Sequence, residues 1–120
     1  MLVEIKELRK TFDNGTKALQ GVNLSVNEGE FVVVLGASGS GKTTLLRSIN
    51  GLVDYEQGEI KFCDNIISPS TLPALRKKTG MVFQDFNLVN NLSSLNNVLT
   101  GLLDSSNTLM SVLYLFTKEQ

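Results

Sequence analysis

A glycine-rich segment, residues 36–43, constrains the fold of this chain more than any other feature of its sequence. It reads Gly-Ala-Ser-Gly-Ser-Gly-Lys-Thr and fits the pattern G-x-x-x-x-G-K-[ST], whose backbone N–H groups surround phosphate groups. The apolar run Phe31–Leu35 precedes it, and Leu45, Ile49 and Leu52 follow at helical spacing. The sequence therefore predicts a buried strand, a phosphate-binding loop and an amphipathic helix, which is an α/β arrangement.

Each residue type in this segment suits the phosphate tail of a nucleotide. Glycine lets the backbone approach closely, and a helix N-terminus adds the positive end of its dipole. Lys42 supplies a positive charge for the β- and γ-phosphates, the Thr43 hydroxyl suits Mg²⁺, and Thr44 can donate to the α-phosphate. The loop residues predicted to bind nucleotide are Gly36, Ser38, Gly39, Ser40, Gly41, Lys42, Thr43 and Thr44. The alternative is a surface turn with a solvated lysine.

Alternating apolar and polar residues predict strands with one wet face. Residues 3–6 and 22–26 alternate in this way, and residues 59–63 repeat the pattern. Such strands are typical of an antiparallel sheet. The short apolar run Met81–Phe83 instead predicts a buried strand.

Leucine spacing predicts two helices. The first covers about residues 42–50 and ends at Gly51. The second follows from the leucines between residues 92 and 102, with Ser93 as its N-cap. Residues 65–73, which hold both prolines, are predicted to form a loop.

The composition excludes several classes of protein. Lys and Arg number 11 against 12 Asp and Glu, so no basic excess favours nucleic acid, and Arg76–Lys78 is predicted to be a solvated basic surface. The chain has no histidine, which excludes histidine-dependent triads and histidine-ligated metals. Its single cysteine, Cys63, permits neither an internal disulfide nor a cysteine-rich zinc site, and we expect it to be a small buried side chain.

Length and hydropathy point to one small domain in the cytoplasm. The 120 residues are 42% hydrophobic, which allows one modest core. No run reaches the about 18 apolar residues that span a bilayer, and charges near the N-terminus argue against a signal peptide. Any membrane contact is therefore expected to go through a partner.

Three anchors in order and spacing show what the chain resembles. Phe12 precedes the stretch 14–19, the glycine-rich loop follows, and Thr79–Gln84 looks like a strand that ends in a functional glutamine. From Met1 to about Leu103 the chain resembles the N-terminal half of an ATP-binding-cassette (ABC) transporter ATPase. The resemblance implies a P-loop NTPase fold, with an antiparallel β subdomain and part of a RecA-like core.

The resemblance also implies functional roles. Phe12 would stack on adenine, Lys42 and Gln84 would be catalytic, and Thr43 and Gln84 would hold Mg²⁺. ATP and Mg²⁺ are the implied cofactors. The loop after Gln84 would meet the permease subunits, and a second ATPase subunit would complete a homodimer at the cytoplasmic face of the membrane. Nucleic acid is not an implied partner.

Within this family the chain is most similar to the phosphonate-import type, on a bacterial importer. The similarity lies in residues 46–52, Leu75–Lys78 and the tail 111–119. Several positions depart from the pattern, among them Asn96, where the family often has glutamate. Phe12 replaces the commoner tyrosine, although stacking needs only the ring; Leu102 and Asp104 stand where arginine and glycine are expected.

The family's later motifs do not occur in residues 1–120. We find no signature motif, no Walker B carboxylates and no switch histidine, so the resemblance describes a truncated nucleotide-binding domain. It implies weak nucleotide binding without hydrolysis by this chain, and exposed apolar sheet surface. Two alternatives stay open: another phosphate-loop enzyme such as a nucleotide kinase or small GTPase, and an inactive nucleotide-binding or interaction fragment from a broken gene.

Overall fold

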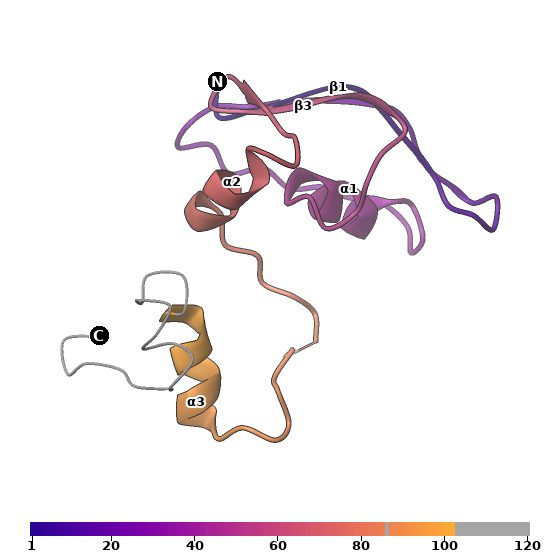
Figure 1. The fold of residues 1–120 in the computed structure, drawn as a ribbon. Helices are drawn as coiled ribbons and strands as arrows, with labels where there is room; N and C mark the ends of the chain where they lie inside the picture. The colour runs from indigo at the N-terminus through magenta and orange to yellow at the C-terminus, as the bar shows by residue number, and fades with distance from the viewer. Residues whose placement is uncertain (86, 103–120) are drawn as a thin grey trace. The chain divides into compact units, whose positions relative to one another are not determined.

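The computed structural model of the chain describes residues 1–85 and 87–102. These residues form two compact units, Met1–Met81 and a second unit that begins at Val82. The first holds an antiparallel sheet and two helices, and the second holds a third helix (Figure 1). Among the described residues no helix is long and apolar enough to cross a membrane.

The sheet confirms the three strands that alternation predicts. β1 (Val3–Thr11) lies between β2 (Lys17–Val26) and β3 (Gln57–Phe62), and a short β4 (Asn65–Ile66) lies at the edge beside β3. All of the pairings are antiparallel. The strand order β2-β1-β3-β4 places β1 in the centre, because β2 pairs with it through a short turn and β3 returns on its other side.

The two faces of this sheet differ in the way the alternation predicts. On the wet face Glu4 pairs with Lys6 at 2.9 Å, and Glu59 pairs with Lys61 at 2.9 Å. The opposite face forms the hydrophobic core of the first unit. The buried residues of that core are Ile5, Leu8, Leu19, Leu45 and Ile60.

Two helices lie on the core side of the sheet (Figure 1). α1 (Lys42–Ile49) confirms the first predicted helix, with Asn50 as its C-cap and a left-handed φ of 61° at Gly51. α2 (Leu72–Lys78) corrects the prediction of a loop over 65–73, since β4 and the start of α2 fall there. Proline in the first turn of a helix breaks no intrahelical hydrogen bond, so Pro73 is compatible with helix.

The prediction of a buried strand before the glycine-rich loop is wrong. Phe31–Leu35 is assigned to no strand, and Phe31 and Leu35 are 93% and 86% exposed. Met81–Phe83 likewise forms no strand, and Val82 is 99% exposed. A strand buried on both faces needs neighbours on both sides, and no described strand pairs with either run. The expected apolar surface is therefore exposed, but on segments outside the sheet rather than on a sheet face.

The prediction that Cys63 is buried is also wrong, because its side chain is exposed. It lies in the turn between β3 and β4, where its φ is 45° and its N–H donates to the Leu2 carbonyl at 2.9 Å. The backbone of the turn, rather than the polarity of the thiol, places this side chain outside the core.

The second unit contains the second predicted helix in shortened form. α3 (Ser94–Leu99) continues into a 3₁₀ turn, η1 (Thr100–Leu102). Ser93 is the N-cap, as predicted, and its hydroxyl accepts a hydrogen bond from the Asn96 N–H at 3.2 Å. Asp104 and the tail 111–119, which enter the phosphonate-type resemblance, lie outside the described residues.

Candidate functional site

The glycine-rich loop leads directly into the N-terminus of α1, as the sequence predicts. Gly41 is the N-cap, with a φ of 89°, and no side chain caps the helix. A Cβ atom at Gly41 would collide with the Ala18 carbonyl of β2, so glycine lets the loop approach the sheet. The first turn of an α-helix leaves its N–H groups without intrahelical acceptors, and they remain open to an anion.

The Lys42 ammonium group lies folded back over the loop that precedes it. Its Nζ donates to the carbonyl oxygens of Gly36 at 2.8 Å and Ala37 at 2.6 Å, and lies 3.3 Å from the Ser40 Oγ. These contacts hold a positive charge at the loop and offset the carbonyl dipoles, which would otherwise repel an anion.

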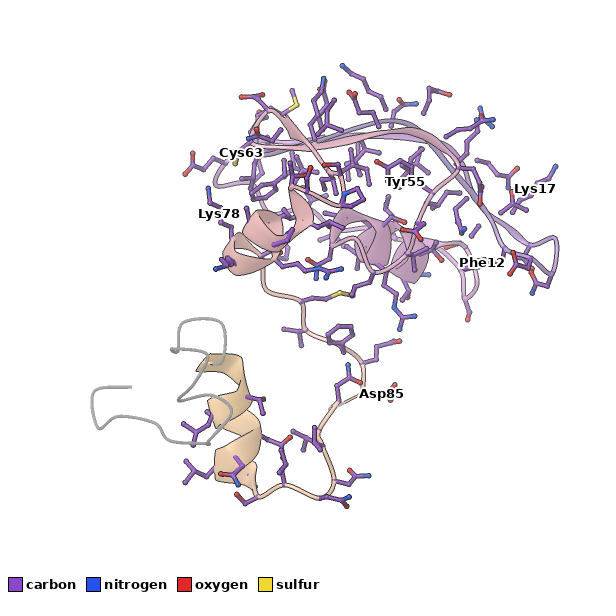
Figure 2. The ribbon with its side chains drawn as sticks, in the orientation of Figure 1. Phe12, Lys17, Tyr55, Cys63, Lys78 and Asp85 are labelled. Carbon is purple, nitrogen blue, oxygen red and sulfur yellow. The ribbon has the colours of Figure 1, made fainter. Side chains whose placement is uncertain are left out.

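A cavity of about 170 Å³ brings the loop together with the aromatic residue from the β1–β2 turn. It is smaller than the roughly 300–1,000 Å³ of most ligand pockets, so it would hold part of a nucleotide and leave the rest in solvent. Figure 2 shows Phe12 beside the loop that precedes α1. The lining residues are Phe12, Thr16, Ala18, Gly39, Ser40, Gly41, Lys42, Thr43 and Thr44.

Phe12 is held in place by its own turn. Its N–H donates to the Thr16 carbonyl at 2.9 Å, and its carbonyl accepts from the Gly15 N–H at 2.8 Å. Phe12 is 38% exposed, and the Lys10 ammonium lies 5.5 Å from the centre of its ring. An accessible aromatic ring at the mouth of an anion site can stack on a nucleobase.

The structure brings together most, but not all, of the predicted site residues. Gly36 and Ser38 do not line the 170 Å³ cavity; Gly36 lines an adjoining cavity of about 400 Å³ against β2. Gln84 belongs to the second unit, so its predicted role beside Lys42 stays a prediction. Thr16 and Ala18 were missed as lining residues, although they lie in the stretch 14–19 that anchors the resemblance.

The donor set fits a phosphate group with a divalent cation. Lys42 and Thr43 line the cavity at the N-terminus of α1. The helix N–H groups and the lysine ammonium suit phosphate oxygens, and the threonine hydroxyl suits Mg²⁺. The described residues contain no group of three or more His, Cys, Asp or Glu that could hold a metal ion. A magnesium ion here would therefore depend on phosphate oxygens and water besides Thr43, which is the usual way in which Mg²⁺ binds.

Curated relatives match nearly the whole of this chain. It is 47% identical to the phosphonates import ATP-binding protein PhnC of Shouchella clausii, over 98% of the chain and 46% of that protein. PhnC of Lactobacillus acidophilus is 46% identical, over 98% of the chain and 47% of the relative. The chain thus spans about half the length of these relatives.

Solved structures agree with this match. The ATP-binding cassette MJ0796, in a dimeric post-hydrolysis state bound to ADP and Pi, superposes with a TM-score of 0.78 at 36% identity, over 88% of this chain and 49% of that one. CbiO1 of Clostridium perfringens, part of an ABC transporter complex, gives 0.66 at 28% identity, over 86% and 49%. The model of the ABC transporter family matches residues 19–119. With its α/β P-loop fold, this chain belongs to the ABC transporter family.

Proposed function

We propose that this chain is part of the ATP-binding subunit of a bacterial ABC importer for phosphonates or phosphate esters, and that it binds ATP through the loop 36–43. One observation carries the proposal: Lys42, the first residues of α1 and Phe12 line one cavity. The phosphonate class is supported by the names of the relatives that are 46–47% identical.

Each residue of the cavity has a defined role in this proposal. Lys42 and the first-turn N–H groups of α1 bind the phosphates, and Phe12 stacks on the base. Thr43 would hold Mg²⁺, which when bound neutralises phosphate charge. Gln84 would complete the metal shell and orient the attacking water, and the loop after it would contact the permease subunits at the cytoplasmic face of the membrane.

Nucleotide binding, rather than turnover, is the activity proposed for residues 1–120. Hydrolysis requires the phosphates, the metal and the attacking water to be positioned together. This chain supplies the first of these and part of the second. The carboxylates, the signature motif and the histidine that the family uses for the rest do not occur in its sequence. A second ATPase subunit would pair with the complete protein.

Calorimetry on the full 120-residue chain tests the proposal. Mg·ATP should bind, and Lys42→Ala should weaken binding by roughly 2–5 kcal/mol, because the charged contact to the phosphates is lost. Lys78→Ala, at the end of α2, is the control and should bind as the wild type does. Equal affinity of the wild type and Lys42→Ala would contradict the proposed site. A preference for GTP would favour a different phosphate-loop enzyme.

An interaction fragment without nucleotide binding is the second candidate. The exposed apolar run Phe31–Leu35 favours it, because exposed apolar surface promotes association. Binding of Mg·ATP distinguishes the two: the interaction fragment would show none by calorimetry, while sedimentation velocity would show it self-associating or binding a partner.

A further inference from the structure

The Phe12 ring lies at the end of β1, at a point where the sheet is irregular. The register between β1 and β2 shifts between Lys10 and Thr11, which is a bulge or irregularity of the pairing. Bulges redirect the strand and its side chains and are common beside functional sites. The position of Phe12 therefore depends on what fixes the two residues before it.

Glu56 contacts three consecutive residues of β1 at this point. Its N–H donates to the Arg9 carbonyl at 3.0 Å, its Oε2 accepts from the Thr11 N–H at 2.7 Å, and its Oε1 pairs with the Lys10 ammonium at 3.0 Å. Because β3 begins only at Gln57, the carboxylate extends the hydrogen bonding of β3 to Thr11. The Lys10 and Thr11 donors hold the pKa of Glu56 below its usual range.

The same ion pair places a cation against the aromatic ring. The Lys10 side chain is only 18% exposed, and its Nζ lies 5.5 Å from the centre of the Phe12 ring. An ammonium group at this distance is attracted by the π-face of the ring. Lys10, from the adjacent strand β1, therefore holds Phe12, which lines the same cavity as Lys42.

We propose that Glu56 and Lys10 are positioning residues of the nucleotide site: Glu56 holds Lys10, and Lys10 holds the Phe12 ring where an adenine can stack on it. This inference rests on the proposed ATP binding and adds to it a determinant of base recognition that lies outside the phosphate loop. Neither residue needs to contact the nucleotide.

Two ligands separate recognition of the base from recognition of the phosphates. Calorimetry with Mg·ATP and with magnesium tripolyphosphate, which has no base, is carried out on the full chain. Phe12→Ala removes stacking altogether and should lower the affinity for ATP by about 5- to 150-fold. Lys10→Met and Glu56→Gln should each weaken ATP by about two- to fivefold, the scale of an exposed cation–π contact, and leave tripolyphosphate unchanged.

The two substitutions change the charge in opposite directions. Lys10→Met removes a positive charge, and Glu56→Gln removes a negative one. A general electrostatic effect on the phosphates would therefore weaken ATP binding by the first variant and strengthen it for the second. Positioning of Phe12 predicts a loss for both. Lys10→Arg keeps the cation and should retain the affinity of the wild type. Glu59→Gln is the matched control. It breaks a similar ion pair, of 2.9 Å, between Glu59 and Lys61 within β3.

The outcomes distinguish this inference from the proposed function. If the wild type binds ATP, and Lys10→Met and Glu56→Gln bind it equally well, the positioning role is refuted and the nucleotide site stands. Parallel losses for tripolyphosphate would also refute positioning. If the wild type binds neither ligand, the proposed function itself fails. Circular dichroism checks the fold of each variant, and Lys10→Met carries the test alone if Glu56→Gln does not fold.

Discussion

The sheet formed by β1, β2 and β3 and the segment Phe31–Leu35 are both rich in β-branched and apolar residues, yet only the sheet is packed. Ile5, Leu8 and Ile60 are at most 1% exposed, whereas Phe31 is 93% exposed. The difference does not lie in β-propensity, which favours strand in both regions. It lies in the availability of strand partners.

Among the residues that the structure describes, the sheet has nearby strand partners and the segment Phe31–Leu35 has none. β1 and β2 are joined by a short turn and pair from Val3 with Val26 to Thr11 with Lys17. Phe31–Leu35 finds no partner among the described strands. Its continuous apolar pattern requires cover on two faces, and no described strand supplies it. A strand pattern thus predicts a strand only where its neighbours are present.

The largest effect is expected from the packed region. Leu8→Ala should lower the free energy of unfolding by about 2–5 kcal/mol, because it leaves a cavity beneath β1. Urea unfolding followed by circular dichroism measures this change. A loss below about 0.5 kcal/mol would mean that the core of the sheet is not packed as described.

The second-largest loss of stability is expected where the glycine-rich loop meets the sheet. Gly41→Ala places a methyl group against the Ala18 carbonyl at a positive φ, and should cost about 1–3 kcal/mol of stability. Gly29→Ala is the matched control: it has a similar φ of 79° but open space around the new Cβ. Equal unfolding midpoints for the two variants would show that the close approach of loop and sheet is unimportant.

The stability of α3, in the second unit, should depend on its N-cap rather than on side-chain packing. α3 has no buried residues among those described, so its stability depends on local hydrogen bonds. Ser93→Ala removes the acceptor for the Asn96 N–H and should cost about 1 kcal/mol of local stability. Hydrogen exchange of the Asn96 amide measures it. Ser94→Ala, inside the helix, should leave this exchange rate unchanged.

Acid should weaken the sheet region through its carboxylates. Lys6 lowers the pKa of Glu4, and Asn27 lowers that of Glu30. A carboxyl group whose pKa is lower in the folded state contributes stability above its unfolded pKa, and that stability is lost as the pH falls through the folded value. Urea midpoints should therefore fall on acidification below about pH 4.3. The fall should be smaller for Glu30→Gln; an identical profile would contradict the assignment.

The smallest effect is expected in the exposed run. Val33 is 60% exposed, so Val33→Thr should change the free energy of unfolding by no more than about 0.5 kcal/mol. It should also reduce self-association, because it interrupts an apolar surface. Urea unfolding and sedimentation velocity test both statements. A loss comparable to that of Leu8→Ala would show that Phe31–Leu35 is packed after all.

Much of the site could be predicted from sequence because its chemistry is local. The loop 36–43, the start of α1 at Lys42 and the N-cap at Ser93 each depend on residues within a few positions of one another. The contacts of Glu56 with β1 could not be predicted in this way. They join residues about 46 positions apart, and no short pattern marks them.

The sequence by itself determined the phosphate loop, the alternating strands and the family, since backbone freedom, charge and periodicity are properties of short segments. Only the tertiary structure decided that Phe31–Leu35 is exposed and that Cys63 lies on the surface. It also places Phe12 and Lys42 around one cavity, a proximity that the sequence implied only through its resemblance to the family. Burial and proximity depend on which distant segments pack together, and the alternation of a strand does not contain that information.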